Sequence, residues 1–310
     1  MDLQSTKSRS KSIWFVVYLA GCVAIFSRPV GELFRLALSA DVYSHILVIP
    51  WISVALIYLK RHAIFKFGPE GGTSKLAVAF FAAGVFLTAF TRWWAGSGSS
   101  EVSLALTILG LVLLIWAGFA GFHGRRAFRA ALFPLLFLLL MLPPPAVVLD
   151  GVIVWLQHGS ATLTGWIFYL TGTPAVRDGM FFAVPGVIIE ITRECSGIRS
   201  TIATLTTCLL AGYLILQGTR NRAVLLLVAV PVVILKNGIR ISTLTLLAVH
   251  VDPAFLDGRL HHDGGVVFFL TGLALLLPVL WGLHRTEAGH ANGDLRVSQT
   301  PLGPPAQPAC

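Results

Sequence analysis

Residues 223–242 read AVLLLVAVPVVILKNGIRIS, with no charged side chain before Lys236. A helix needs about 20 mostly apolar residues to cross the hydrocarbon core of a bilayer, so this stretch predicts a membrane span. Arg240 lies near its end, where a guanidinium is costly and usually faces a partner or a polar cavity. Lys236 is expected to extend its ammonium group to the lipid headgroups instead. One helix end therefore predicts both a membrane fold and a polar site.

The composition of all 310 residues extends this interpretation to the whole chain. Hydrophobic residues make up 55% and charged residues 12%, with a mean hydropathy of +0.80, whereas soluble domains carry about 25% charged residues. We therefore expect an all-α polytopic membrane protein. The formal charge of +9 belongs to Lys and Arg residues in short loops, where they set the orientation of the spans, so nucleic acid is not an expected partner.

Stretches of sufficient apolar length predict about eight transmembrane helices. Segment 149–175 carries Asp150, Gln157 and His158 among apolar residues, so it is expected either to cross the membrane or to lie in the interface. The positive-inside bias favours the interface, because an additional span there would move Arg220 and Arg222 to the outside. The expected spans lie near 13–30, 42–59, 76–95, 102–120, 128–148, 200–217, 223–242 and 264–283.

This topology places both termini in the cytoplasm and divides the chain into a single transmembrane domain, 1–285, and a tail, 286–310. The tail is polar and Pro-rich, and we expect it to be disordered. Residues 176–192 predict two short extended pieces around the turn Pro185-Gly186. These pieces would form a small extracytoplasmic hairpin directly before Cys195.

Cys195 lies in the run ECSGIRS (194–200), just before an expected span. A helix N-terminus and nearby cations favour the thiolate, which is the nucleophilic form, and Arg193 and Arg199 supply the cations. Cys22 and Cys208 fall within spans, where a thiol usually fills space. The four cysteines have no CxxC spacing, so we expect neither a disulfide framework nor a metal or other cofactor.

His261 and His262 precede the last expected span. A neutral imidazole can take a proton from a thiol and return it to a leaving amine, and the chemistry of the residues alone leaves both histidines open. In the expected topology, which rests on charge, Cys195, Arg240 and His261 all arrive at the outer leaflet. A thiol, a cation and an imidazole are the parts of an acyl-transfer site.

These motifs resemble those of the exosortase and archaeosortase family of membrane-embedded cysteine transpeptidases. In that family the histidine stands four residues before a glycine, which selects His261 and leaves His262 as the alternative. The resemblance covers most of residues 40–280. It rests on CSGIRS (195–200), NGIRI (237–241), and His261 followed by Gly265 and Phe268-Phe269, with further likeness at Tyr43-Ser44-His45, Phe133-Pro134 and Pro143–Pro145.

The resemblance implies the catalytic set Cys195, Arg240 and His261. Cys195 would attack the scissile carbonyl and form a thioester, and His261 would act as general base and then as general acid. Arg240 would stabilise the oxyanion or orient the thiolate. The same motifs supply candidate substrate-binding residues in Ser196, Arg199 and Asn237, of which Arg199 would meet an acidic residue of the substrate.

The implied substrates are exported proteins whose C-terminal signal joins a Pro-Glu-Pro-like motif, a hydrophobic helix and a basic end. Cleavage would take place at the outer face of the bacterial inner membrane, with transfer of the acyl group to an unknown acceptor nucleophile.

Two other functions fit the sequence. A transporter or flippase for an anionic lipid or polysaccharide could use Arg199, Lys236 and Arg240 as a cationic path, and it predicts that Cys195 is dispensable. A non-catalytic partner in the export of envelope polysaccharide predicts that neither the thiol nor the histidine matters.

Overall fold

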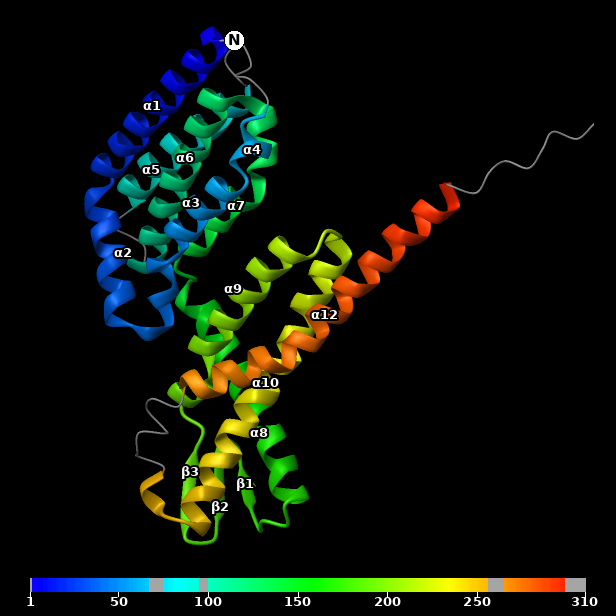
Figure 1. The fold of residues 1–310 in the computed structure, drawn as a ribbon. Helices are drawn as coiled ribbons and strands as arrows, with labels where there is room; N and C mark the ends of the chain where they lie inside the picture. Colours follow the sequence, from blue (N-terminus) through cyan, green and yellow to red (C-terminus); the bar gives the residue numbers. More distant parts are fainter. Residues whose placement is uncertain (1, 67–74, 95–99, 256–264, 299–310) are drawn as a thin grey trace, which may run out of the picture. The chain divides into compact units, whose positions relative to one another are not determined.

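The computed structural model of the chain describes residues 2–66, 75–94, 100–255 and 265–298. The chain forms two compact units, Met1–Val152 and Ile153–Cys310, each treated by itself below. Figure 1 labels the α-helices and strands of both units.

The first unit is helical. Its elements are α1 (Asp2–Ile25), α2 (Ser27–Ser39), η1 (Asp41–Leu47), α3 (Ile49–Leu59), α4 (Arg61–Ile64), α5 (Lys75–Trp94), α6 (Ser100–Ala130), α7 (Leu132–Phe137), η2 (Leu138–Met141) and the start of α8 (Ala146–Leu170). Helix α6 is the centre of this unit, and α5 runs beside it (Figure 1). The two helices approach closely at Gly84, where an added Cβ atom would lie 3.0 Å from the carbonyl oxygen of Gly110. Small residues commonly allow such close contact between helices in a membrane.

Large apolar side chains lie on the outside of the helices as well as in the core. Trp51, Phe86 and Trp93 are 72%, 71% and 80% exposed, which suits a surface covered by lipid. Among the described residues, seven helices are long and apolar enough to cross a membrane, and an eighth results if α1 and α2, bent by 74°, form one span. The expected all-α membrane fold of about eight spans is confirmed.

The expected span at 128–148 is wrong. Helix α6 is kinked at Gly124, where the backbone is not helical, and a second helical piece carries the basic residues to Ala130. The short apolar segment Leu132–Met141 follows it. The prolines from Pro143 to Pro145 end that segment because proline cannot donate a helical hydrogen bond.

Helix α8 takes the place of that span. It is one continuous helix with the length and composition of a membrane span, although the sequence favoured an interfacial position for 149–175. Gln157, Ser160 and Thr164 recur on one face of the helix and are buried, whereas Trp155 and Trp166 are exposed, as are the polar His158 and Thr162. The three buried polar side chains therefore face protein, as polar residues within a membrane span usually do.

The described part of the second unit combines four long helices with a small sheet. Its elements are the rest of α8, β1 (Val176–Asp178), β2 (Phe181–Val184), β3 (Val187–Glu190), η3 (Glu194–Ser196), α9 (Ile198–Ile215), α10 (Thr219–His250), η4 (Pro253–Phe255) and α12 (Gly265–Ser298). The tail expected to be disordered from residue 286 is thus helical as far as Ser298.

The sheet is antiparallel with the order β1-β2-β3. Strands β2 and β3 pair with Val184 opposite Val187, so Pro185 and Gly186 form the turn that the sequence predicts, and β1 adds a third strand. Phe182 and Ile189 are buried in a cluster that includes Ala161 of α8 and Ile241 of α10. The sheet therefore packs on the helices that carry the polar residues described next.

Candidate active site

Cys195 lies in a short 3-10 turn, η3, between the sheet and α9. We call residues 192–197 the thiol loop. The Cys195 side chain is half-buried and packs against the cluster formed by the sheet, α8 and α10. Backbone hydrogen bonds of 3.1 Å, from Cys195 N–H to the Thr192 carbonyl and from Ser196 N–H to the Arg193 carbonyl, close the turn. The thiol thus occupies a fixed position next to the first turn of a helix.

The thiol loop turns into α9 at Gly197, whose φ of 73° belongs to the left-handed region that glycine adopts at little cost. A Cβ atom at this position would lie 2.6 Å from Asn237 Oδ1. The Gly197 carbonyl accepts hydrogen bonds from the Ser200 and Thr201 hydroxyls, at 3.0 and 2.9 Å. Both the backbone conformation and the lack of space therefore require glycine here.

Asn237 of α10 holds the thiol loop from the other side. Its Nδ2 donates to the Cys195 carbonyl and to Ser160 Oγ of α8, both at 2.9 Å, and the side chain is 2% exposed. Helices α8 and α10 approach closely at this level, since a Cβ atom at Gly238 would lie 2.7 Å from Leu163 Cδ2. One buried amide thus joins the thiol loop, α8 and α10.

Gln157 of α8 anchors the segment that leads into the thiol loop. Its Nε2 donates a 2.8 Å hydrogen bond to the Ile191 carbonyl, just after β3. Gln157 and Ser160 lie three residues apart and hence on one face of α8. This helix face supports the thiol loop at two points.

Lys236 is 1% exposed, and its ammonium group donates a hydrogen bond to Ser200 Oγ. Its stem packs against α12, where a Cβ atom at Gly272 would lie 3.0 Å from Lys236 Cδ. The expectation that Lys236 extends to the headgroups is therefore wrong, because a hydroxyl within the protein binds its charge. Arg240 is half-buried and follows Lys236 by one turn of α10. Viewed down the helix axis, it lies between the directions of Lys236 and Asn237.

The comparison with protein families decides the membership of this chain. The model described as "Transmembrane exosortase (Exosortase_EpsH)" matches residues 37–278. The chain belongs to the transmembrane exosortase family. The matched range contains the thiol loop, α10 and both candidate histidines, and it confirms the resemblance seen in the motifs. Neither the curated proteins nor the solved structures give a significant match.

In this exosortase the predicted substrate-binding residues have different surroundings. Arg199 is exposed in the first turn of α9. Ser196 is 1% exposed, and its Oγ accepts a 3.3 Å hydrogen bond from Ile198 N–H. Ser196 and Asn237 thus support the thiol loop from within, whereas Arg199 faces outward.

His261 and His262 lie outside the described residues, so their position relative to Cys195 stays a prediction. The cysteines Cys22, Cys195 and Cys208 are free thiols, of which only Cys195 among these three is not fully buried. Within the described ranges, no group of three or more His, Cys, Asp or Glu side chains could hold a metal ion.

Sequence reasoning missed Ser160, Gln157, Ser200 and the buried position of Lys236. A signal for α8 was present, because Gln157, Ser160 and Thr164 recur at helical spacing in an apolar segment. No comparable signal distinguishes a buried lysine from one that reaches the headgroups.

Proposed function

We propose that this exosortase is a cysteine transpeptidase or protease that cleaves C-terminal sorting signals of exported proteins, with Cys195 as the nucleophile. The observation that carries the proposal is the hydrogen bond from Asn237 to the Cys195 carbonyl. This bond holds the backbone of the half-buried Cys195 against the part of α10 that also bears Arg240. A cysteine that only fills space would not need a left-handed glycine and a buried amide to hold its loop.

In the first step, Cys195 Sγ attacks the carbonyl carbon of the scissile peptide, and a C–S bond forms while the carbonyl oxygen becomes an oxyanion. The guanidinium of Arg240 stabilises this charge, because a fixed cation away from bulk water acts strongly on charge that develops in the transition state. His261 takes the thiol proton and gives it to the leaving amine as the C–N bond breaks, which leaves a thioester.

In the second step, an acceptor nucleophile or water attacks the thioester, and the Cys195 thiolate leaves. Arg199 is exposed next to the thiol loop and would bind an acidic residue of the Pro-Glu-Pro-like motif. His262 is the alternative to His261. His261 lies four residues before Gly265, and His262 lies three residues before it. The role of the histidine rests on the family motif and on its chemistry.

We place the reaction at the outer face of the bacterial inner membrane. With α8 as a span and α1 and α2 as one bent span, an N-terminus in the cytoplasm brings the thiol loop and the C-terminal end of α10 to the outside. Arg125, Arg126, Arg220 and Arg222 then stay in the cytoplasm, as the positive-inside bias requires. Both termini are cytoplasmic in this arrangement.

The test is processing of a tagged exported protein with such a C-terminal signal, co-expressed with each variant at equal membrane level. Cys195→Ala, Arg240→Ala and His261→Ala should abolish the cleaved product, whereas His262→Ala should retain it. Cys208→Ala removes a fully buried thiol of α9 and is the matched control, which should leave cleavage unchanged. Cleavage that persists in Cys195→Ala would reject the thiol mechanism and favour the transporter or flippase for an anionic lipid or polysaccharide.

A further inference from the structure

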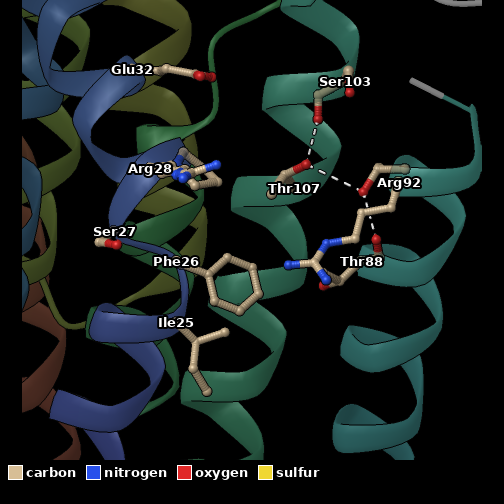
Figure 2. A pocket seen from close by; sticks show the side chains of 11 residues that line it. Ile25, Phe26, Ser27, Arg28, Glu32, Thr88, Arg92, Ser103 and Thr107 are labelled. Carbon is tan, nitrogen blue, oxygen red and sulfur yellow. Dashed lines mark hydrogen bonds between the residues drawn. The ribbon is translucent and has the colours of Figure 1, made fainter. Parts of the chain in front are cut away.

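The first unit contains a pocket at the break between α1 and α2. Its volume is about 550 Å³, within the range of about 300–1,000 Å³ typical of ligand sites. Figure 2 shows its wall, which is formed by residues of the break, by α5 and by the N-terminal part of α6. The lining residues all belong to this unit, and none of them is part of the thiol loop.

Two arginines give this pocket a positive lining. Arg28 comes from the first turn of α2 and Arg92 from the last turn of α5, while Glu32 is the one carboxylate among the lining residues. Figure 2 shows the guanidinium of Arg92 extending toward Phe26. The start of α2 also faces the pocket, and a helix N-terminus attracts anions through its unpaired N–H groups and its dipole.

The threonine hydroxyls of the wall already have partners in the protein. Thr88 Oγ1 donates to the Gly84 carbonyl at 2.8 Å, and Thr91 Oγ1 donates to the Thr88 carbonyl at 2.9 Å. Thr107 Oγ1 donates to the Ser103 carbonyl at 2.8 Å. Besides the hydroxyls of Ser27 and Ser103, the two guanidinium groups are the side-chain donors that the described lining residues offer, and they are the only charged donors among them. Guanidinium groups bind phosphate oxygens with paired, charge-assisted hydrogen bonds.

Exposed apolar residues neighbour the pocket in the chain. We call Ile25, which lines the pocket, and Trp93, which follows the lining residue Arg92, the apolar rim, and they are 72% and 80% exposed. The ring of Phe90 lies 6.2 and 6.0 Å from those of Trp93 and Trp94. Tryptophans at the end of an apolar helix are typical of the membrane interface. Acyl chains can cover this apolar rim while a charged headgroup enters the pocket.

We propose that the pocket formed by the α1–α2 break, α5 and α6 binds the phosphate headgroup of an anionic phospholipid through Arg28 and Arg92. The two guanidinium groups contact the phosphate oxygens, and the exposed Ile25 and Trp93 contact the acyl chains. This proposal does not depend on the catalytic role of Cys195. The competing explanation is that both arginines only extend to the bulk headgroups, as basic residues at helix ends commonly do.

The experiment measures how much phosphatidylglycerol copurifies with the full-length chain from mixed phosphatidylcholine and phosphatidylglycerol nanodiscs after detergent washing, by native mass spectrometry. Arg28→Gln and Arg92→Gln should each lower the amount of retained phosphatidylglycerol by about fivefold, and the double variant should lower it further. Arg35→Gln is the matched control, because it removes the same charge from α2 at an exposed position that does not line the pocket. Glu32→Gln should raise the affinity, since it removes the carboxylate.

A thermal unfolding curve of each variant in detergent separates loss of binding from loss of the fold, and the gain expected for Glu32→Gln cannot arise from unfolding. Equal retention of phosphatidylglycerol by the wild type, the double variant and Arg35→Gln would overturn the proposal in favour of nonspecific headgroup contact. Displacement of the lipid by an equal concentration of soluble glycerol phosphate would overturn the assignment to a lipid. Failure of glycerol phosphate to displace it supports the lipid.

Discussion

The side-chain amide of Asn237 donates a 2.9 Å hydrogen bond to the backbone carbonyl of Cys195, from a helix that lies 42 residues further along the chain. The bond fixes the backbone of the proposed nucleophile without touching its sulfur. Since the same Nδ2 also donates to Ser160 Oγ, one buried amide sets the positions of the thiol loop and α8 relative to α10. Asn237 is thus a positioning residue, and the motif NGIRI contributes it together with Arg240.

Asn237→Asp should lower processing of the tagged substrate by about tenfold or more. The substitution keeps the shape of the side chain but removes both N–H donors, and a buried carbonyl that loses its donor costs about 1–3 kcal/mol. Ser160→Ala is the matched control, because it removes the other partner of the amide and leaves the bond to Cys195. Full processing by Asn237→Asp, at an equal membrane level, would show that this hydrogen bond does not position the thiol.

Gly197→Ala should destabilise the second unit and abolish processing. A left-handed conformation costs a residue with a Cβ atom about 1–2 kcal/mol, and here the added atom would also meet Asn237 Oδ1 at 2.6 Å. Gly172→Ala isolates the cost of the left-handed backbone conformation, since Gly172 has a similar φ of 67° and nothing lies within 4 Å of the added atom. We expect a small fall in the melting temperature for Gly172→Ala and a larger one for Gly197→Ala. Equal falls would mean that the contact with Asn237 is unimportant.

Lys236→Met should leave the melting temperature unchanged or raise it, yet lower processing. Replacing a buried charge by an apolar side chain of similar length is often neutral or stabilising, whereas the site would lose a cation one turn from Arg240. Ser200→Ala completes a double-mutant cycle, because Lys236 donates its hydrogen bond to Ser200 Oγ. Non-additive losses of processing would show that the two act together. A parallel loss of stability and processing in Lys236→Met would instead assign the lysine a purely structural role.

The membrane fold and the thiol motif could be predicted from the sequence because both depend on local composition. Apolar length identifies most spans, and Pro185-Gly186 identifies the turn between β2 and β3. The positive-inside bias does not favour α8 as a span as long as 128–148 is counted as one, because a further crossing would move Arg220 and Arg222 outside. Apolar length alone makes α8 a candidate span. Gln157 and Ser160 make hydrogen bonds inside the protein, so their polarity does not keep α8 out of lipid.

Lys236 shows the same limit for a single residue. A lysine near the end of a span has a long enough stem to reach the headgroups, and the sequence does not contain the position of Ser200 in space. Only the packing of α9 and α12 against α10 determines that its charge stays inside. Tertiary contacts also decide that Ser196 and Asn237 support the thiol loop from a buried position, although both belong to motifs that suggest contact with substrate.

The topology derived from α8 gives the last prediction. A reporter enzyme fused after Pro144 should be found on the cytoplasmic side, and one fused after Thr173 on the outer side, because α8 would cross the membrane between them. A fusion after Gly218, between α9 and α10, is the control and should again be cytoplasmic, since Arg220 and Arg222 follow it. If the first two fusions report the same side, α8 does not cross. Without that crossing, the segments after α8 would lie on the opposite side of the membrane unless another segment crossed instead. The outer position proposed for Cys195 would lose its support.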